Sequence, residues 1–160
     1  MRTLGLRAEP KSFFWAVSEG SQEKPILVDS GHVEAPSTYS YPEAARYLRT
    51  KLLQLIDKED LSKAGLRTPE MIAGRTESFR ERLRTEGVLL EGCAQTGLKV
   101  TQGPLGTLSK LLGTKAKPLL ESGEYRGIDL EKMPTSKREA ILMSVSLLEA
   151  ENADSHKRKV

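Results

Sequence analysis

Cysteine is almost absent from this chain of 160 residues, which contains only Cys93. An intramolecular disulfide is therefore excluded. Long apolar runs are missing as well, so no membrane span is expected, and residues 1–9 lack the apolar core of a signal peptide. Neither a phosphate loop nor a dinucleotide-binding glycine fingerprint occurs. We therefore expect a cytoplasmic protein outside the common nucleotide-binding classes.

Aromatic residues are scarce, at 5% of the sequence, so the core has to be built mainly from aliphatic side chains. The one large aromatic cluster is Phe13-Phe14-Trp15, which we predict to serve core and sheet packing, with base stacking as the alternative for any outward-facing ring. His32 and His156 are too far apart in sequence to suggest metal ligands, and both are expected on the surface. Cys93 is predicted to be buried and inert.

Acidic residues are missing from residues 92–120, although the chain as a whole carries a net charge of only +3. The same stretch contains four lysines, Lys99, Lys110, Lys115 and Lys117. One interpretation is an ordinary solvated basic surface. The other is a patch that faces the phosphates of a nucleic acid.

Hydrophobic patterning predicts one α/β domain over residues 1–151, followed by a disordered polar tail at 152–160. Three short strands come first and favour an antiparallel meander. Helices and strands then alternate, which predicts a five-stranded mixed sheet flanked by helices. The helix at 76–96 is given a buried side that includes Phe79, Leu83, Val88, Leu90 and Cys93. The expected strands are 3–8, 12–19, 25–33, 64–67 and 98–101, and the expected helices are 42–60, 76–96, 105–112 and 136–150.

Several local motifs follow one another in a defined order. The first strand reads Thr3-Leu4-Gly5-Leu6-Arg7, the second contains Trp15-Ala16-Val17, and the last helix begins Ser136-Lys137-Arg138-Glu139-Ala140-Ile141. Between them stand Gly87-Val88-Leu89-Leu90, Gly97-Leu98-Lys99-Val100 and Pro104, with a lysine-containing segment ending at Gly113. In this order the motifs resemble, over residues 3–150, the RuvC family of Holliday-junction resolvases, which has the RNase H-like fold.

The resemblance implies a site for two divalent cations, held by four carboxylates, that hydrolyses a phosphodiester. Its first ligand would stand at position 7, where this chain has Arg7. Its second ligand would lie on the fourth strand, where the register leaves Arg67 or Glu70 as the occupant. The last two would be Ser136 and Glu139. Arginine cannot ligate a cation and repels one, so at most two of the four carboxylates remain.

One hypothesis is a catalytically inactive domain that binds structured DNA or RNA and needs no cofactor. Arg7 and Arg67 would lie near the former scissile phosphate, to which arginine can make two parallel hydrogen bonds. The residues assigned to the nucleic acid are Arg7, Arg67, Lys99, Lys110, Lys115, Lys117, Lys137 and Arg138.

A second hypothesis is a structural or protein-interaction subunit, a homodimer included, in which Arg7 and Glu139 form an ion pair across the former metal cleft. A third is a rearranged nuclease that binds Mg²⁺ through Glu9, Glu70 and Glu139. Glu9 belongs to this set because it lies two residues after Arg7 and so shares its strand face.

Overall fold

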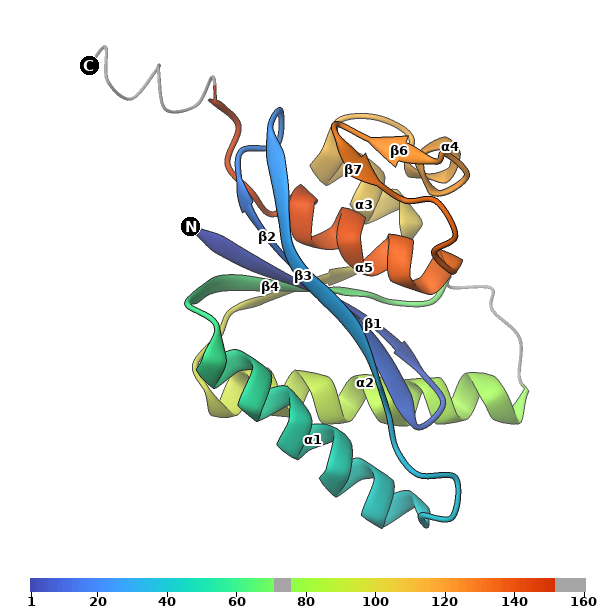
Figure 1. Cartoon of the computed structure of the whole chain (residues 1–160). Helices are drawn as coiled ribbons and strands as arrows, with labels where there is room; N and C mark the ends of the chain where they lie inside the picture. Colours follow the sequence, from blue (N-terminus) through green and yellow to red (C-terminus); the bar gives the residue numbers. More distant parts are fainter. Residues whose placement is uncertain (71–75, 152–160) are drawn as a thin grey trace.

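The computed structural model describes residues 1–70 and 76–151 and contains a five-stranded sheet with helices on both faces (Figure 1). The strand order is β3-β2-β1-β4-β5. Strands β1 to β3 form an antiparallel meander, whereas β4 pairs parallel to β1 and β5 parallel to β4. The sheet strands are β1 (Arg2–Glu9), β2 (Ser12–Gly20), β3 (Pro25–Glu34), β4 (Leu61–Arg67) and β5 (Val100–Gly103). The predicted fold class, a mixed five-stranded α/β sheet flanked by helices, is confirmed.

Five helices cover the sheet within the described residues. Helices α1 and α2 lie on one face, and α5 lies on the other with α3, α4 and the two-stranded hairpin β6–β7 (Figure 1). Their bounds are α1 (Tyr41–Lys58), α2 (Glu77–Gln95), α3 (Leu105–Leu112), α4 (Ala116–Leu120) and α5 (Thr135–Ser146), and the hairpin is β6 (Glu124–Tyr125) and β7 (Ile128–Asp129). None of these helices is long and apolar enough to cross a membrane.

The side chains of β1 alternate between the two faces of the sheet, so this one strand contributes to the packing on both faces. Leu4, Leu6 and Ala8 are fully or almost fully buried in the cluster that α1 and α2 share with the sheet. Gly5 and Arg7 point to the opposite face, because successive side chains alternate across a strand. A Cβ atom at Gly5 would overlap the Ala140 carbonyl of α5. Glycine at this position therefore lets α5 pack directly on the sheet and places it beside Arg7.

Polar contacts also fix α5 on the sheet. The Thr3 hydroxyl donates to the Ser144 carbonyl at 2.5 Å, and the Ser18 and Ser144 hydroxyls are 2.6 Å apart, all in the buried interior. Buried hydroxyls are stable only when they are hydrogen-bonded. The contacts therefore define both the position and the rotation of α5, and with them the direction of its first turn.

Local signals account for the start of α1. Ser40 and Glu43 form a reciprocal capping box, and Pro42 occupies the first turn, where a missing N–H costs nothing. The buried residues of α1 are Ala44, Leu48 and Leu52, which recur at four-residue spacing and form one apolar stripe facing the sheet.

Three expectations need correction. Helix α2 buries Cys93 as predicted, and Val88 and Leu90 pack partly buried against the core, but Leu83 is exposed. Its other buried residues are Thr85, Glu86, Leu89 and Gly92, so the buried face is rotated by about one residue from the predicted one. Strand β5 begins and ends two residues later than expected, and α5 ends at Ser146 rather than near residue 150. The predicted disordered tail at 152–160 lies outside the described residues.

Candidate functional site

The register of the parallel strands settles which residue stands beside Arg7. Leu6 of β1 is the partner of Leu66 of β4, so Arg7 and Arg67 follow at the same level of the sheet. Both strands end at this edge, where the carboxyl ends of β1 and β4 meet. Arg67, rather than Glu70, is therefore the neighbour of Arg7 on the sheet.

Glu139 lies between these two arginines. Its Oε2 atom accepts a hydrogen bond from Arg7 Nε at 2.5 Å, and its Oε1 atom lies 3.6 Å from Arg67 Nη2. All three side chains are largely buried, with exposed fractions of 13% for Arg7, 8% for Arg67 and 7% for Glu139. The predicted ion pair between Arg7 and Glu139 is confirmed, and it extends to a second arginine.

A third arginine comes from α2, on the other face of the sheet. Arg82 Nη2 donates to the Arg67 carbonyl at 3.1 Å, and Arg82 Nε lies 3.6 Å from Glu86 Oε1. Burial, reinforced by the positive charge of Arg7, lowers the pKa of Arg82 to about 10. Burial also raises the pKa of Glu86, against the effect of Arg82. Sequence reasoning missed this pair, whose only signal was an Arg–Glu spacing of four residues, which is typical of exposed helix surfaces.

Two further carboxylates form the rim of this cluster. Glu9 accepts a hydrogen bond from the Ser136 hydroxyl and lies 3.6 Å from Arg7 Nη1. The Oε1 atom of Glu70 accepts from Arg67 Nη2 at 3.1 Å and from the Leu105 N–H at 3.0 Å. Glu70 therefore bridges Arg67 and the first residue of α3, the end of a helix that favours an anion.

These positions do not fit a pair of magnesium ions. The guanidinium groups of Arg7 and Arg67 stand next to the carboxylates that a shifted metal site would need, and each of Glu9, Glu70 and Glu139 is engaged by an arginine. A fixed positive charge at that distance opposes a divalent cation. Residues 1–70 and 76–151 contain no group of three or more His, Cys, Asp or Glu side chains arranged to hold a metal ion.

The lysines of the acid-free stretch lie on several elements around α3: Lys110 on α3 itself, Lys115 and Lys117 at the start of α4, and Lys99 just before β5. Lys115 and Lys117 line a hollow of about 360 Å³ together with the first turn of α3, and Lys110 is exposed on the same helix. Lys99 lies at the far end, beside Lys63 in a second hollow of about 360 Å³ that the last turn of α3 also lines. Within the described residues none of these lysines forms an ion pair.

The two basic residues at the start of α5 differ in their surroundings. Lys137 is half-buried and, within the described residues, has no carboxylate partner. The Arg138 guanidinium donates to the carbonyls of Met133, Leu120 and Ser122 at 2.9–3.0 Å. Arg138 therefore ties α5 to the segment after α4, and we leave it out of the candidate binding surface.

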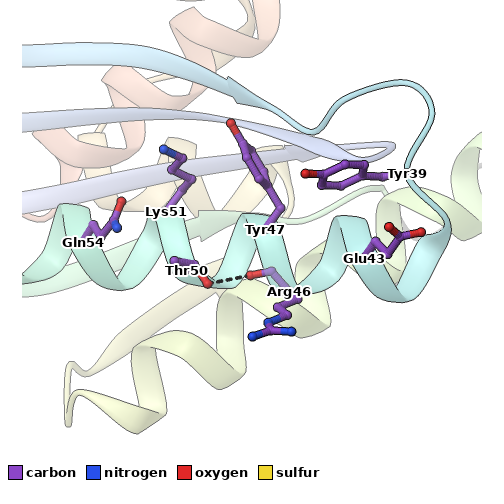
Figure 2. A pocket seen from close by; sticks show the side chains of 7 residues that line it. All are labelled: Tyr39, Glu43, Arg46, Tyr47, Thr50, Lys51 and Gln54. Atoms are coloured by element: carbon purple, nitrogen blue, oxygen red, sulfur yellow. Dashed lines mark hydrogen bonds between the residues drawn. The ribbon is translucent and has the colours of Figure 1, made fainter.

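Other features lie apart from the arginine cluster. A hollow of about 460 Å³ on the outer side of α1 is lined by residues of both charge signs and by Tyr39 and Tyr47, with none of the predicted site residues among them (Figure 2). Lys51 Nζ lies 5.4 Å from the centre of the Tyr47 ring there. Cys93 is buried, as expected, and burial raises its pKa to about 11, which suppresses the reactive thiolate.

Comparison with solved structures identifies the architecture. Thermus thermophilus RuvC in complex with a Holliday junction substrate superposes with a TM-score of 0.73 at 12% identity, covering 91% of this chain and 92% of that one. The chain has a RuvC-like, RNase H-like fold. The yeast mitochondrial Holliday junction resolvase Ydc2 follows with a TM-score of 0.59 at 9% identity, covering 98% of this chain and 83% of that one.

The fowlpox virus resolvase, solved with Holliday junction DNA, gives a TM-score of 0.51 at 9% identity and covers 91% of this chain and 95% of that one. Neither a family model nor a curated relative matches the sequence. The likeness of this chain to the RuvC-like resolvases therefore rests on the path of the backbone.

Proposed function

We propose that this RuvC-like domain binds structured DNA or RNA and does not hydrolyse it. The observation that supports the proposal is a side-chain carboxylate that occupies an anion position at the edge of the site. The Glu70 carboxylate, about half exposed, bridges the Leu105 N–H and the Arg67 guanidinium. A phosphate oxygen makes the same two kinds of hydrogen bond at a helix start.

The surroundings of this bridge favour a phosphodiester chain. Lys115 and Lys117 line the adjoining hollow together with Glu121, and Lys110 adds an exposed positive charge on α3. Lys99 lies with Lys63 and Glu149 at the hollow beside the last turn of α3. A phosphate that displaces Glu70 would lie between Arg67 and the first turn of α3, with the lysines facing its neighbours along the chain. Structural relatives that are resolved with Holliday junctions use the same fold, which supports DNA as the partner.

Hydrolysis is excluded from the proposal on electrostatic grounds. Two-metal hydrolysis requires carboxylates to compensate two divalent cations. In this chain Arg7 and Arg67 compensate Glu139 instead, and Glu9 and Glu70 are paired with the same arginines. The cluster is thus held together by its own ion pairs.

The test is a salt titration of binding to a fluorescein-labelled four-way DNA junction, with a structured RNA hairpin in parallel. Affinity should fall steeply between about 50 and about 200 mM salt. Lys115→Ala and Lys117→Ala should each reduce the slope of log K against log salt by about 0.9. Lys58→Ala is the matched control, an exposed lysine at the end of α1 on the other face of the sheet. Glu70→Ala should tighten binding, because it removes the competing carboxylate.

The proposal fails if neither nucleic acid binds at about 50 mM salt. It also fails if Lys58→Ala reduces the slope of log K against log salt as much as Lys115→Ala and Lys117→Ala do. A second candidate, a structural or protein-interaction subunit, would then take its place. The observation in its favour is that Arg7, Arg67 and Arg82 all have a carboxylate within 4 Å. A homodimer would be its simplest form, to be measured by light scattering.

A further inference from the structure

A row of side chains crosses the sheet at the level of the arginine cluster. Phe14 of β2 is the partner of Arg7 in β1, and His32 of β3 is the partner of Phe14. Directly opposed residues of antiparallel strands present their side chains on the same face. Arg7 contacts Glu139 of α5, so the whole row, His32-Phe14-Arg7, lies on the α5 face.

The two rings of this row are stacked on each other. The Phe14 and His32 ring centroids are 4.0 Å apart and their planes differ by 7°. Phe14 packs against the hydrophobic cluster around α5, whereas His32 is exposed. β3 is an edge strand, and Phe14 covers one face of the imidazole. The other face of the ring therefore points past the edge of the sheet.

Packing accounts for Phe14 but leaves the exposed imidazole unexplained. Stacking on Phe14 fixes the orientation of the imidazole ring. A planar ligand that stacks on the ring would therefore lose less side-chain entropy on binding. Proteins that bind single-stranded DNA place aromatic rings beside a positively charged track in the same way. The row supplies the rings. Arg7, two strand spacings or about 10 Å from His32, is already paired with Glu139 and Glu9, whereas Lys137 at the start of α5 has no carboxylate partner within the described residues and can meet a phosphate.

We propose that the outer face of His32, backed by Phe14, stacks an unpaired base of a DNA strand whose phosphates lie toward Lys137. This inference rests on the proposed nucleic-acid binding and adds to it a preference for unpaired bases.

Two probes separate base stacking from phosphate contact. The first is a fluorescein-labelled single-stranded DNA oligonucleotide, and the second is an oligonucleotide of the same length in which the bases are replaced by abasic sites. Their phosphates are the same, so only the first can stack on His32. Binding is measured by fluorescence anisotropy of the full chain at about 50 mM salt.

His32→Ala should weaken binding of the normal oligonucleotide by at least about fivefold and leave the abasic one unchanged, because one stacked base contributes about 1–3 kcal/mol. His32→Tyr should restore the loss, since it returns an aromatic face. Ile26→Ala is the matched control, an exposed residue at the other end of the same strand. Circular dichroism of each variant checks that the sheet is intact.

The outcomes are distinguishable. If both oligonucleotides bind equally to the wild-type protein and His32→Ala changes neither, the base platform is refuted while nucleic-acid binding stands. If His32→Ala weakens both oligonucleotides alike, the residue contacts phosphate and the platform is again refuted. If neither oligonucleotide nor the four-way junction binds, the proposed function fails and this inference fails with it.

Discussion

The buried carboxylate of Glu139 gives the sharpest test of the arginine cluster. Glu139→Gln preserves the shape of the side chain but removes its charge, which leaves Arg7 and Arg67 facing each other. In the native protein the carboxylate lies 2.5 Å from Arg7 Nε and 3.6 Å from Arg67 Nη2, and only 7% of it is exposed. Removing one partner from a buried ion pair costs about 3–5 kcal/mol. For a chain of 160 residues this corresponds to a fall in Tm of about 6–20 °C.

The measurement is urea unfolding at pH 7, followed by the fluorescence of Trp15, the single tryptophan, with Tm from scanning calorimetry. Glu91→Gln is the matched control. Glu91 pairs with Arg49 at 2.6 Å, but the two side chains are 55% and 38% exposed. An exposed pair contributes at most about 1 kcal/mol. If Glu139→Gln lowers the free energy of unfolding no more than Glu91→Gln does, the arginines are solvated and the closed cluster is refuted.

Three further outcomes are expected from the same cluster. Arg82→Met or Glu86→Leu alone should cost about 3–5 kcal/mol, whereas the double variant should unfold at a urea midpoint equal to or above that of the wild type, because burial opposes both charges. Wild-type stability should fall as the pH rises from 4.5 through the raised pKa of Glu86, since the folded state keeps that proton longer than the unfolded chain does. The double variant should lack this dependence. Arg7→Asp combined with Arg67→Glu should create a metal site, so Mn²⁺ should raise the Tm of this double variant. An Mn²⁺ effect of the same size on the Tm of the wild type would contradict the account.

The pattern of apolar residues predicted the sheet well, because each strand is marked by signals within its own segment of the sequence. The strand pairs of the meander follow from apolar runs separated by short turns, and Lys11 adopts the positive φ that the tight β1–β2 turn requires. The bounds of α3 are those expected, because its apolar residues recur within one short segment that Pro104 and Gly113 delimit.

The buried face of the first half of α2 could not be predicted from its own residues. Phe79 and Leu83 suggested one stripe, but the first half of the helix runs beside the arginine cluster rather than over the apolar core. Glu86 is buried there because Arg82 is beside it, and Leu83 turns outward to solvent. Tertiary contacts of this kind override hydrophobic periodicity.

The candidate site was predictable in part. Resemblance placed Arg7, Glu139 and Ser136 at one edge of the sheet, and the charges of Arg7 and Glu139 suggested their ion pair. Whether Arg67 or Glu70 stands next to Arg7 depended on the pairing of β1 with β4, because a one-residue slip turns every side chain to the other face. The role of Glu70 as an anion at the start of α3 likewise required the positions of two separate elements.

Incubation of the protein with a labelled four-way DNA junction and Mg²⁺ or Mn²⁺ tests the central claim most directly. Binding and cleavage are read in the same samples, on native and denaturing gels, for the wild type and for Glu139→Gln. The account predicts a complex that weakens with salt and a junction that stays uncut with either ion. Cleavage by the wild type that Glu139→Gln abolishes would contradict it.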